Sequence, residues 1–307
     1  MSFFDPAKFT KETIESLKEQ LSGKSIIAAS GGVDSTVAAA LVSKAVSDEL
    51  LAIYVDTGYM RLGESEFVSS MLSELGVNHK VVNASERFYE GLKGVIDPEE
   101  KRKIIGELFI RIFEEESKEY GGKFLVQGTI APDWIESGGG MRDTIKSHHN
   151  VGGLPEDMEM SLCEPIRELY KDEVRSLAEF LDVPVAHRQP FPGPGLAVRV
   201  MGEATPERTE VVRQACHIVE DELELAAKEG KMELPWQYFA VILPVKTVGV
   251  QGDVRAYGNT IAVRAVQSYD AMTAQALEIP YTVLKKISER ITRELKSEVN
   301  RVVYDIT

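Results

Sequence analysis

The segment Ser30-Gly-Gly-Val-Asp-Ser-Thr36 joins a short apolar run at residues 25–29 to an Ala-rich helical stretch at residues 36–46. The apolar run is typical of a buried strand. Gly31 and Gly32 allow positive φ angles and let backbone N–H groups come close to a ligand. The positive end of the following helix points to the same place, so the segment predicts an anion-binding loop. It is not a Walker loop, because no Gly-Lys-Ser/Thr follows the glycines.

Strands and helices are expected to alternate on both sides of this loop. The sequence predicts strands at residues 25–29, 50–55, 79–82 and 123–126, and helices at residues 8–21, 36–46, 64–75, 97–120 and 170–181. Such alternation predicts an α/β fold with a doubly wound parallel sheet, covered by helices on both faces. Ligands bind beyond the carboxyl ends of strands in these sheets, so the loops after residues 29, 55 and 126 should form one rim.

A second, smaller domain is expected after the segment Arg188-Gln-Pro-Phe-Pro-Gly-Pro-Gly195, which its prolines and glycines exclude from regular structure. We therefore predict one domain at residues 1–190 and an α+β domain at residues 191–307. The first domain contains a Gly-, Ser- and Asp-rich stretch at residues 127–160, which we interpret as a lid without regular structure. The second domain is expected to hold helices at residues 205–228 and 281–297, and strands near residues 238–250, 259–268 and 301–305.

Composition restricts the class of protein. The net charge of −14 disfavours nonspecific binding to nucleic acid, because an acidic surface repels a phosphate backbone. No run approaches the ~20 apolar residues of a membrane span. Residues 1–10 have no basic start and no apolar signal core, so we expect a cytoplasmic protein without membrane contact. Cys163 and Cys216 form no pair with metal-binding or disulfide spacing, and buried thiols are the plainer interpretation.

The glycine loop resembles the signature of the PP-loop ATP pyrophosphatases, whose fold is the adenine-nucleotide alpha hydrolase type. Members of that superfamily split ATP into AMP and pyrophosphate, and they hold the pyrophosphate at this loop. A plainer interpretation is also open: the glycines form a turn, and Asp34 caps a helix. We favour the ATP-binding interpretation, because SGGVDS at a strand-to-helix junction is far more specific than a lone glycine pair.

Further blocks resemble the GMP synthase family, in the order in which that family has them. The blocks are Glu99-Glu-Lys-Arg-Lys-Ile-Ile-Gly106, Gln127-Gly-Thr129, Pro132-Asp-Trp-Ile-Glu-Ser137, Ile145-Lys-Ser-His-His-Asn150, Gln189-Pro-Phe-Pro-Gly-Pro-Gly-Leu196, Val248-Gly-Val-Gln-Gly-Asp253 and Arg301-Val-Val-Tyr-Asp305. The resemblance implies a ligase that aminates XMP to GMP, with ATP as substrate and Mg²⁺ as cofactor. It also implies that an adenylyl-XMP intermediate forms and that AMP and pyrophosphate are released.

The resemblance also assigns roles to individual residues. It places ATP and pyrophosphate contacts at Ser30, Gly31, Gly32, Val33, Asp34, Ser35, Thr36, Ile53, Val55, Gln127, Gly128 and Thr129. It places catalytic roles at Asp34, Asp133, Glu136, Lys146 and His148, with Asp34 also as a Mg²⁺ ligand. It places XMP contacts at Arg102, His149, Asn150 and Asp253. Without the resemblance, Asp133 and Glu136 are equally well read as solvated loop carboxylates, and Arg102 as part of a solvated Lys-Arg-Lys run.

The resemblance implies two protein partners. The second domain is expected to form a homodimer. Neither cysteine stands in the context of a glutaminase nucleophile, so a separate glutamine amidotransferase subunit is expected to supply ammonia. Three alternatives stay open from the sequence: another PP-loop amidating ligase such as NAD synthetase, a tRNA-thiolating enzyme, and a nucleotide-binding module without catalysis. The thiolating enzyme is disfavoured by the lack of cysteine pairs and of a basic surface.

Overall fold

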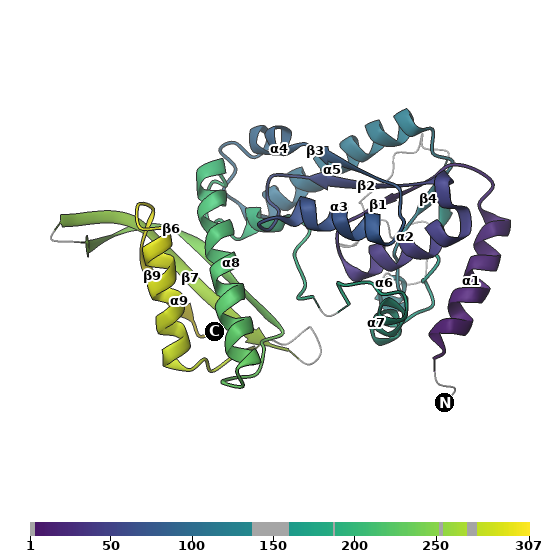
Figure 1. Ribbon diagram of the computed structural model, residues 1–307. Helices are drawn as coiled ribbons and strands as arrows, with labels where there is room; N and C mark the ends of the chain where they lie inside the picture. Colours follow the sequence, from purple (N-terminus) through teal and green to yellow (C-terminus); the bar gives the residue numbers. More distant parts are fainter. Residues whose placement is uncertain (1–3, 137–159, 187, 252–253, 269–274) are drawn as a thin grey trace. The chain divides into compact units, whose positions relative to one another are not determined.

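The computed structural model describes residues 4–136, 160–186, 188–251, 254–268 and 275–307 (Figure 1). The chain divides into two compact units. Unit 1 comprises Met1–Thr57, Gly63–Ala84 and Gly106–Arg188, and unit 2 comprises Gly58–Leu62, Ser85–Ile105 and Gln189–Thr307. The chain passes from one unit to the other five times, because residues 58–62 and 85–105 also belong to unit 2. The predicted domain boundary at residue 190 corresponds only to the last of these passages.

Unit 1 is built on a parallel sheet of five strands, as the alternation of strands and helices predicts. The strands are β1 (Ser25–Ala28), β2 (Leu50–Asp56), β3 (His79–Asn83), β4 (Phe124–Val126) and β5 (Ser161–Cys163). Their order is β3-β2-β1-β4-β5, and every neighbouring pair is parallel. The chain builds outward from β1 in one direction and then returns to build on its other side. The sheet therefore has a topological switch point between β1 and β4, where ligands of such folds bind.

Helices cover both faces of this sheet. The helices are α1 (Pro6–Gln20), α2 (Val33–Val46), α3 (Glu64–Glu74), α7 (Lys171–Phe180) and the part of α5 (Pro98–Tyr120) after residue 105. Figure 1 shows α2 and α3 on one side of the sheet and α5 on the other. Helix α2 packs against α1 and α7 as well as against the sheet, so its residues from Val37 to Val42 are all buried. Its run of small alanines lets these layers approach closely.

Several short elements in the described part of the chain differ from the sequence prediction. Helix α4 (Ser85–Gly91) and strand β5 lie where no element is expected, and both are too short to show a hydrophobic period. Helix α6 (Ala131–Glu136) lies in the stretch 127–160, so the prediction of a lid without regular structure is wrong for that part. Residues 137–159 lie outside the described residues. Short elements held by tertiary contacts leave little local signal in a sequence.

Unit 2 contains a four-stranded sheet with two long helices on it. The elements are η2 (Gly195–Val198), α8 (Pro206–Lys228), β6 (Gln237–Gln251), β7 (Val254–Gln267), β8 (Gln275–Ala276), α9 (Tyr281–Glu294) and β9 (Val299–Asp305). Strands β6 and β8 run antiparallel to β7, whereas β9 runs parallel to it. Helices α8 and α9 pack on one face, where Tyr238, Ala240 and Ile242 alternate as buried residues along β6. The expected smaller α+β domain is confirmed.

A buried lysine fastens the segment around η2 within unit 2. Lys101 on α5 is only 1% exposed, and its ammonium donates hydrogen bonds to the carbonyls of Ala197 (3.1 Å), Val200 (2.7 Å) and Gly202 (2.5 Å). Burial and the nearby charge of Arg208 lower the pKa of Lys101 to about 8.

No helix in the described ranges combines the length and the apolar character that a membrane crossing requires.

Candidate functional site

The predicted glycine loop lies at the carboxyl end of β1 and runs directly into α2. Gly31 has a φ of 74°, as a loop that depends on glycine requires. Helix α2 begins at Val33, three residues earlier than the sequence suggests, and Gly32 precedes it without a side-chain cap. The first N–H groups of a helix have no partner inside the helix. The backbone N–H groups of Val33, Asp34 and Ser35 therefore form a donor set with a positive dipole behind it.

Hydroxyl groups fix the shape of the loop. The Oγ atoms of Ser30 and Ser35 lie 3.0 Å apart, and Ser30 Oγ also accepts a hydrogen bond from the Gly32 N–H at 3.3 Å. Thr36 is buried, and its hydroxyl donates to the Gly32 carbonyl at 2.8 Å. Ser30 is exposed at the loop surface, whereas the hydroxyls of Ser35 and Thr36 both donate to the Gly32 carbonyl, at 3.2 and 2.8 Å.

The carboxylate of Asp34 faces a cation that the sequence prediction missed. Lys171, the first residue of α7, donates from Nζ to both oxygens of Asp34, at 2.8 and 2.7 Å. Both side chains are partly exposed. Lys171 and Asp34 are 137 positions apart in the sequence, and only the packing of α7 on α2 brings them together. No local pattern in the sequence therefore marks Lys171. The loop thus has an anionic and a cationic side chain at its helical end.

The loop after β4 lies against the same helix end. The Gln127 N–H donates to the Cys163 carbonyl at 2.9 Å. A Cβ atom on residue 128 would lie 2.8 Å from both the carbonyl carbon of Asp34 and the nitrogen of Ser35, so only glycine fits there. Thr129 is 5% exposed, and among the described residues its hydroxyl has no hydrogen-bond partner. The structure therefore brings the predicted contacts of the two loops together at the switch point between β1 and β4.

The remaining predicted residues of unit 1 are placed differently. The side chains of Ile53 and Val55 are fully buried, and the Ile53 carbonyl accepts a hydrogen bond from the Ala29 N–H at 2.9 Å. Asp133 accepts a hydrogen bond from the Ile130 N–H at 3.0 Å, so its carboxylate caps the start of α6. The side chains of Ile53 and Val55 belong to the core, so only the backbone of these two strand residues can face a nucleotide.

Several predicted residues lie elsewhere or outside the description. Arg102 belongs to unit 2, where it pairs with Glu99 at 2.5 Å on the exposed side of α5. The side chain of Glu136 and the residues Lys146, His148, His149, Asn150 and Asp253 lie outside the described part of the chain.

Both cysteines are buried and free. Burial raises the pKa of Cys163 to about 11 and also raises the pKa of Cys216. In the described ranges, no group of three His, Cys, Asp or Glu side chains could hold a metal. Asp34 is a carboxylate of the kind that Mg²⁺ uses together with phosphates, but both of its oxygens accept hydrogen bonds from Lys171, so Mg²⁺ could bind there only if Lys171 moved to another partner.

Comparisons with known proteins bear on the whole chain. The family GMP synthase C terminal domain matches residues 224–307, and the phosphoadenosine phosphosulfate reductase domain matches residues 24–104. One subunit of GMP synthase [glutamine-hydrolyzing] from Thermococcus kodakarensis is 58% identical over 303 residues, covering 97% of this chain and 95% of the relative. This chain belongs to the GMP synthase family. The same subunit from Methanocaldococcus jannaschii is 55% identical over 308 residues, with 99% and 96% covered.

A solved structure supports the fold alone. NMN synthetase from Francisella tularensis matches with a TM-score of 0.50 and 14% identity, and the match covers 97% of this chain and 98% of that chain. An identity this low carries no information about substrate.

Proposed function

We propose that this chain is the synthetase subunit of a two-subunit GMP synthase and aminates XMP to GMP at the expense of ATP. Family membership over nearly the whole chain carries this proposal. The glycine loop at the switch point supports it, because the loop combines free N–H donors, hydroxyls and a lysine in one place. The transfer of a phosphoryl-type group depends mainly on positioning and on stabilising charge, and these groups provide both.

The proposed reaction has two steps. Oxygen O2 of XMP attacks the α-phosphorus of ATP, the bond from that phosphorus to the β-phosphate oxygen breaks, and pyrophosphate leaves. Ammonia then attacks C2 of the adenylyl-XMP intermediate, AMP leaves with the oxygen, and a proton is lost to give GMP. The N–H groups of residues 33–35 would bind the departing pyrophosphate, and Lys171 would offer its ammonium to the same oxygens. Mg²⁺, held by Asp34 and the phosphates, would supply further neutralising charge.

Roles for the other predicted residues belong to the proposal. Residues 53–55 and 127–129 would border the adenosine and the phosphates. Asp133, Glu136, Lys146 and His148 would act in the adenylation step, and Arg102, His149, Asn150 and Asp253 would contact XMP. Unit 1 would act as the ATP pyrophosphatase, and residues 191–307 would serve dimerisation and XMP binding. The relatives are named as one of several subunits of a glutamine-hydrolyzing enzyme, which supports a separate glutaminase subunit as partner.

One assay tests the proposal. Pyrophosphate release from MgATP is measured with ammonium and XMP, and then with nicotinate mononucleotide or nicotinate adenine dinucleotide in place of XMP. We expect pyrophosphate and GMP with XMP and only background with the nicotinate acceptors. Turnover with a nicotinate acceptor would instead indicate another amidating ligase, and nucleotide binding without any turnover would indicate a binding module.

A further inference from the structure

Helix α3 forms one wall of the glycine loop. A Cβ atom on residue 31 would lie 2.9 Å from Cγ2 of Val68 and 3.3 Å from Oε1 of Glu64. Both residues lie on the first turns of α3, and Val68 is completely buried. The backbone of the loop therefore runs directly over the carboxylate of Glu64, with no room for a side chain between them.

This placement sets a negative charge beside an anion site. Glu64 is only 5% exposed, so little water screens its carboxylate. A buried carboxylate is costly unless a cation and hydrogen bonds compensate it. A carboxylate a few ångströms from bound phosphates would also repel them, and this repulsion is strongest where water is excluded.

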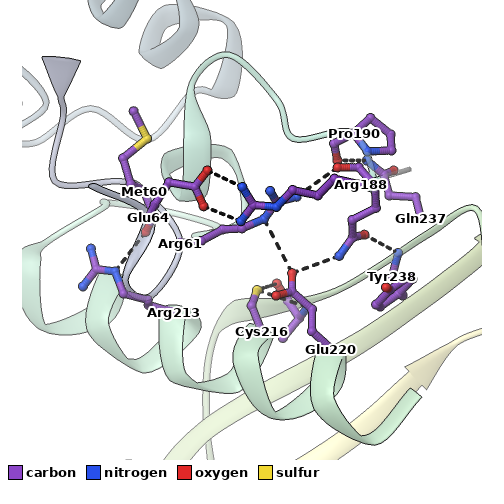
Figure 2. Close-up of polar contacts among 12 residues, drawn as sticks. Met60, Arg61, Glu64, Arg188, Pro190, Arg213, Cys216, Glu220, Gln237 and Tyr238 are labelled. Carbon is purple, nitrogen blue, oxygen red and sulfur yellow. Dashed lines mark hydrogen bonds and ion pairs between the residues drawn. The ribbon is translucent and has the colours of Figure 1, made fainter. Parts of the chain in front are cut away.

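Arg188 supplies the compensating charge. Its Nη1 and Nη2 donate to the two oxygens of Glu64, at 2.8 and 2.6 Å, and Figure 2 shows the carboxylate and the guanidinium facing each other. Such paired contacts are the strong geometry for an arginine and a carboxylate. The guanidinium also lies 4.6 Å from the ring centroid of Phe67, which holds it in place. All three residues belong to unit 1.

We propose that Glu64 and Arg188 are positioning residues of the pyrophosphate loop. Glu64 supports the loop backbone at Gly31, and Arg188 cancels the charge of Glu64 so that the loop can accept an anion. This inference rests on the proposed function, since it assumes that pyrophosphate or the ATP phosphates bind at the loop. It assigns to Arg188 an effect on phosphate affinity that acts through Glu64 and needs no contact with the ligand.

The test measures the binding of inorganic pyrophosphate, with Mg²⁺, to the full chain by calorimetry. Arg188→Met leaves the carboxylate of Glu64 uncompensated, and we expect affinity to fall by about tenfold or more. The double variant Glu64→Gln/Arg188→Met removes both charges, and we expect affinity within about threefold of the parent. Glu64→Gln alone should bind at least as tightly as the parent. Arg290→Met, which breaks ion pairs to Asp221 and Glu222 in unit 2, is the matched control and should change nothing.

A purely structural role gives a different pattern. The double variant would then bind no better than Arg188→Met, and this result would overturn the inference. If Arg188→Met does not fold, the comparison of the double variant with the parent remains, and a loss of about tenfold or more there also overturns it. A parent chain that fails to bind pyrophosphate contradicts the proposed function itself. A parent that binds, with Arg188→Met unchanged, contradicts only the role of Arg188.

Discussion

Gly128 has no side chain, and this allows the loop after β4 to pack directly against the glycine loop at the start of α2. In a Gly128→Ala variant, the new methyl group would lie 2.8 Å from backbone atoms of the first turn of α2, which cannot move without disturbing the glycine loop. We expect a loss of about 1–3 kcal/mol in the free energy of unfolding and a marked loss of pyrophosphate release. Chemical denaturation and the pyrophosphate assay measure the two effects.

Gly106→Ala is the matched control for this change. Gly106 lies inside α5, and a Cβ atom there would meet nothing within 4 Å. Alanine should therefore stabilise the helix by up to about 1 kcal/mol and leave activity unchanged. Equal activity in the two alanine variants would contradict the role given to Gly128.

Lys171 should matter for phosphate binding. Lys171→Ala removes the cation beside Asp34, and it leaves a carboxylate without its partner next to the loop. We expect KM for ATP to rise by about tenfold to a hundredfold, the range for losing a charged hydrogen bond. Lys8→Ala, which breaks an exposed ion pair with Glu12 on α1, should have no such effect. An unchanged KM for ATP in Lys171→Ala would remove Lys171 from the proposed site.

The sequence identifies the residues of the glycine loop, but it does not identify the cations that neutralise the carboxylates at the loop. The glycines and hydroxyls of residues 30–36 form one contiguous pattern between a strand and a helix, so their location can be predicted. Lys171 and Arg188 reach Asp34 and Glu64 across 137 and 124 positions. Nothing near these cations in the sequence specifies a partner, because the pairing arises from the packing of helices on the sheet. Tertiary contacts of this kind leave no local signal.

At the scale of elements, prediction succeeds where length and pattern agree. Strands β1 to β4 are preceded or followed by long helices, and each of them is found within about two residues of its expected position. Strand β5 has only three residues, Ser-Leu-Cys, and two of them are exposed at the edge of the sheet. Hydrogen bonds to β4, rather than its own sequence, make it a strand.

Lys101, near the start of α5, should make the free energy of unfolding depend on pH. A folded-state pKa of about 8, below the usual value of 10.5, means that the folded chain loses this proton at lower pH than the unfolded chain does. The unfolded state then binds more protons between these values, so the free energy of unfolding rises with pH in that window. Relative to a Lys101→Met variant, the wild type should gain on the order of 1–2 kcal/mol between pH 7 and pH 9.5.

Urea denaturation of both chains at the two pH values measures this difference. The comparison with Lys101→Met removes the contributions of other titrating groups, which the two chains share. A difference that shrinks as the pH rises would mean that the three carbonyls hold the lysine in its charged form.

For the whole molecule, we expect a homodimer formed through residues from about 200 to 307. Helices α8 and α9 cover one face of the sheet in unit 2, while Val303 on the opposite face is 40% exposed. Apolar residues on an uncovered face favour association. Sedimentation at micromolar concentration should give the mass of a dimer. A monomer at that concentration would contradict the expectation.

The nitrogen source is also a property of the whole molecule. Both cysteines are buried and have raised pKa values, so neither supplies the thiolate that glutamine hydrolysis requires. We expect GMP formation with ammonium salts, increasing with pH as more ammonia is unprotonated, and almost none with glutamine alone. Adding a separate glutaminase subunit should restore the use of glutamine. Robust GMP formation from glutamine by this chain alone would reveal a catalytic group that these residues do not explain.

The five crossings between the units constrain how the chain folds during synthesis. Residues 58–62 and 85–105 leave the ribosome early, yet the rest of unit 2 begins only at Gln189. At roughly 5–20 residues per second, the stretch 189–307 takes on the order of 10 s to be made. During that time the carbonyls that bind Lys101 have not yet been synthesised, whereas all five strands of the sheet in unit 1 have been. Neither unit can therefore be made as one uninterrupted gene fragment.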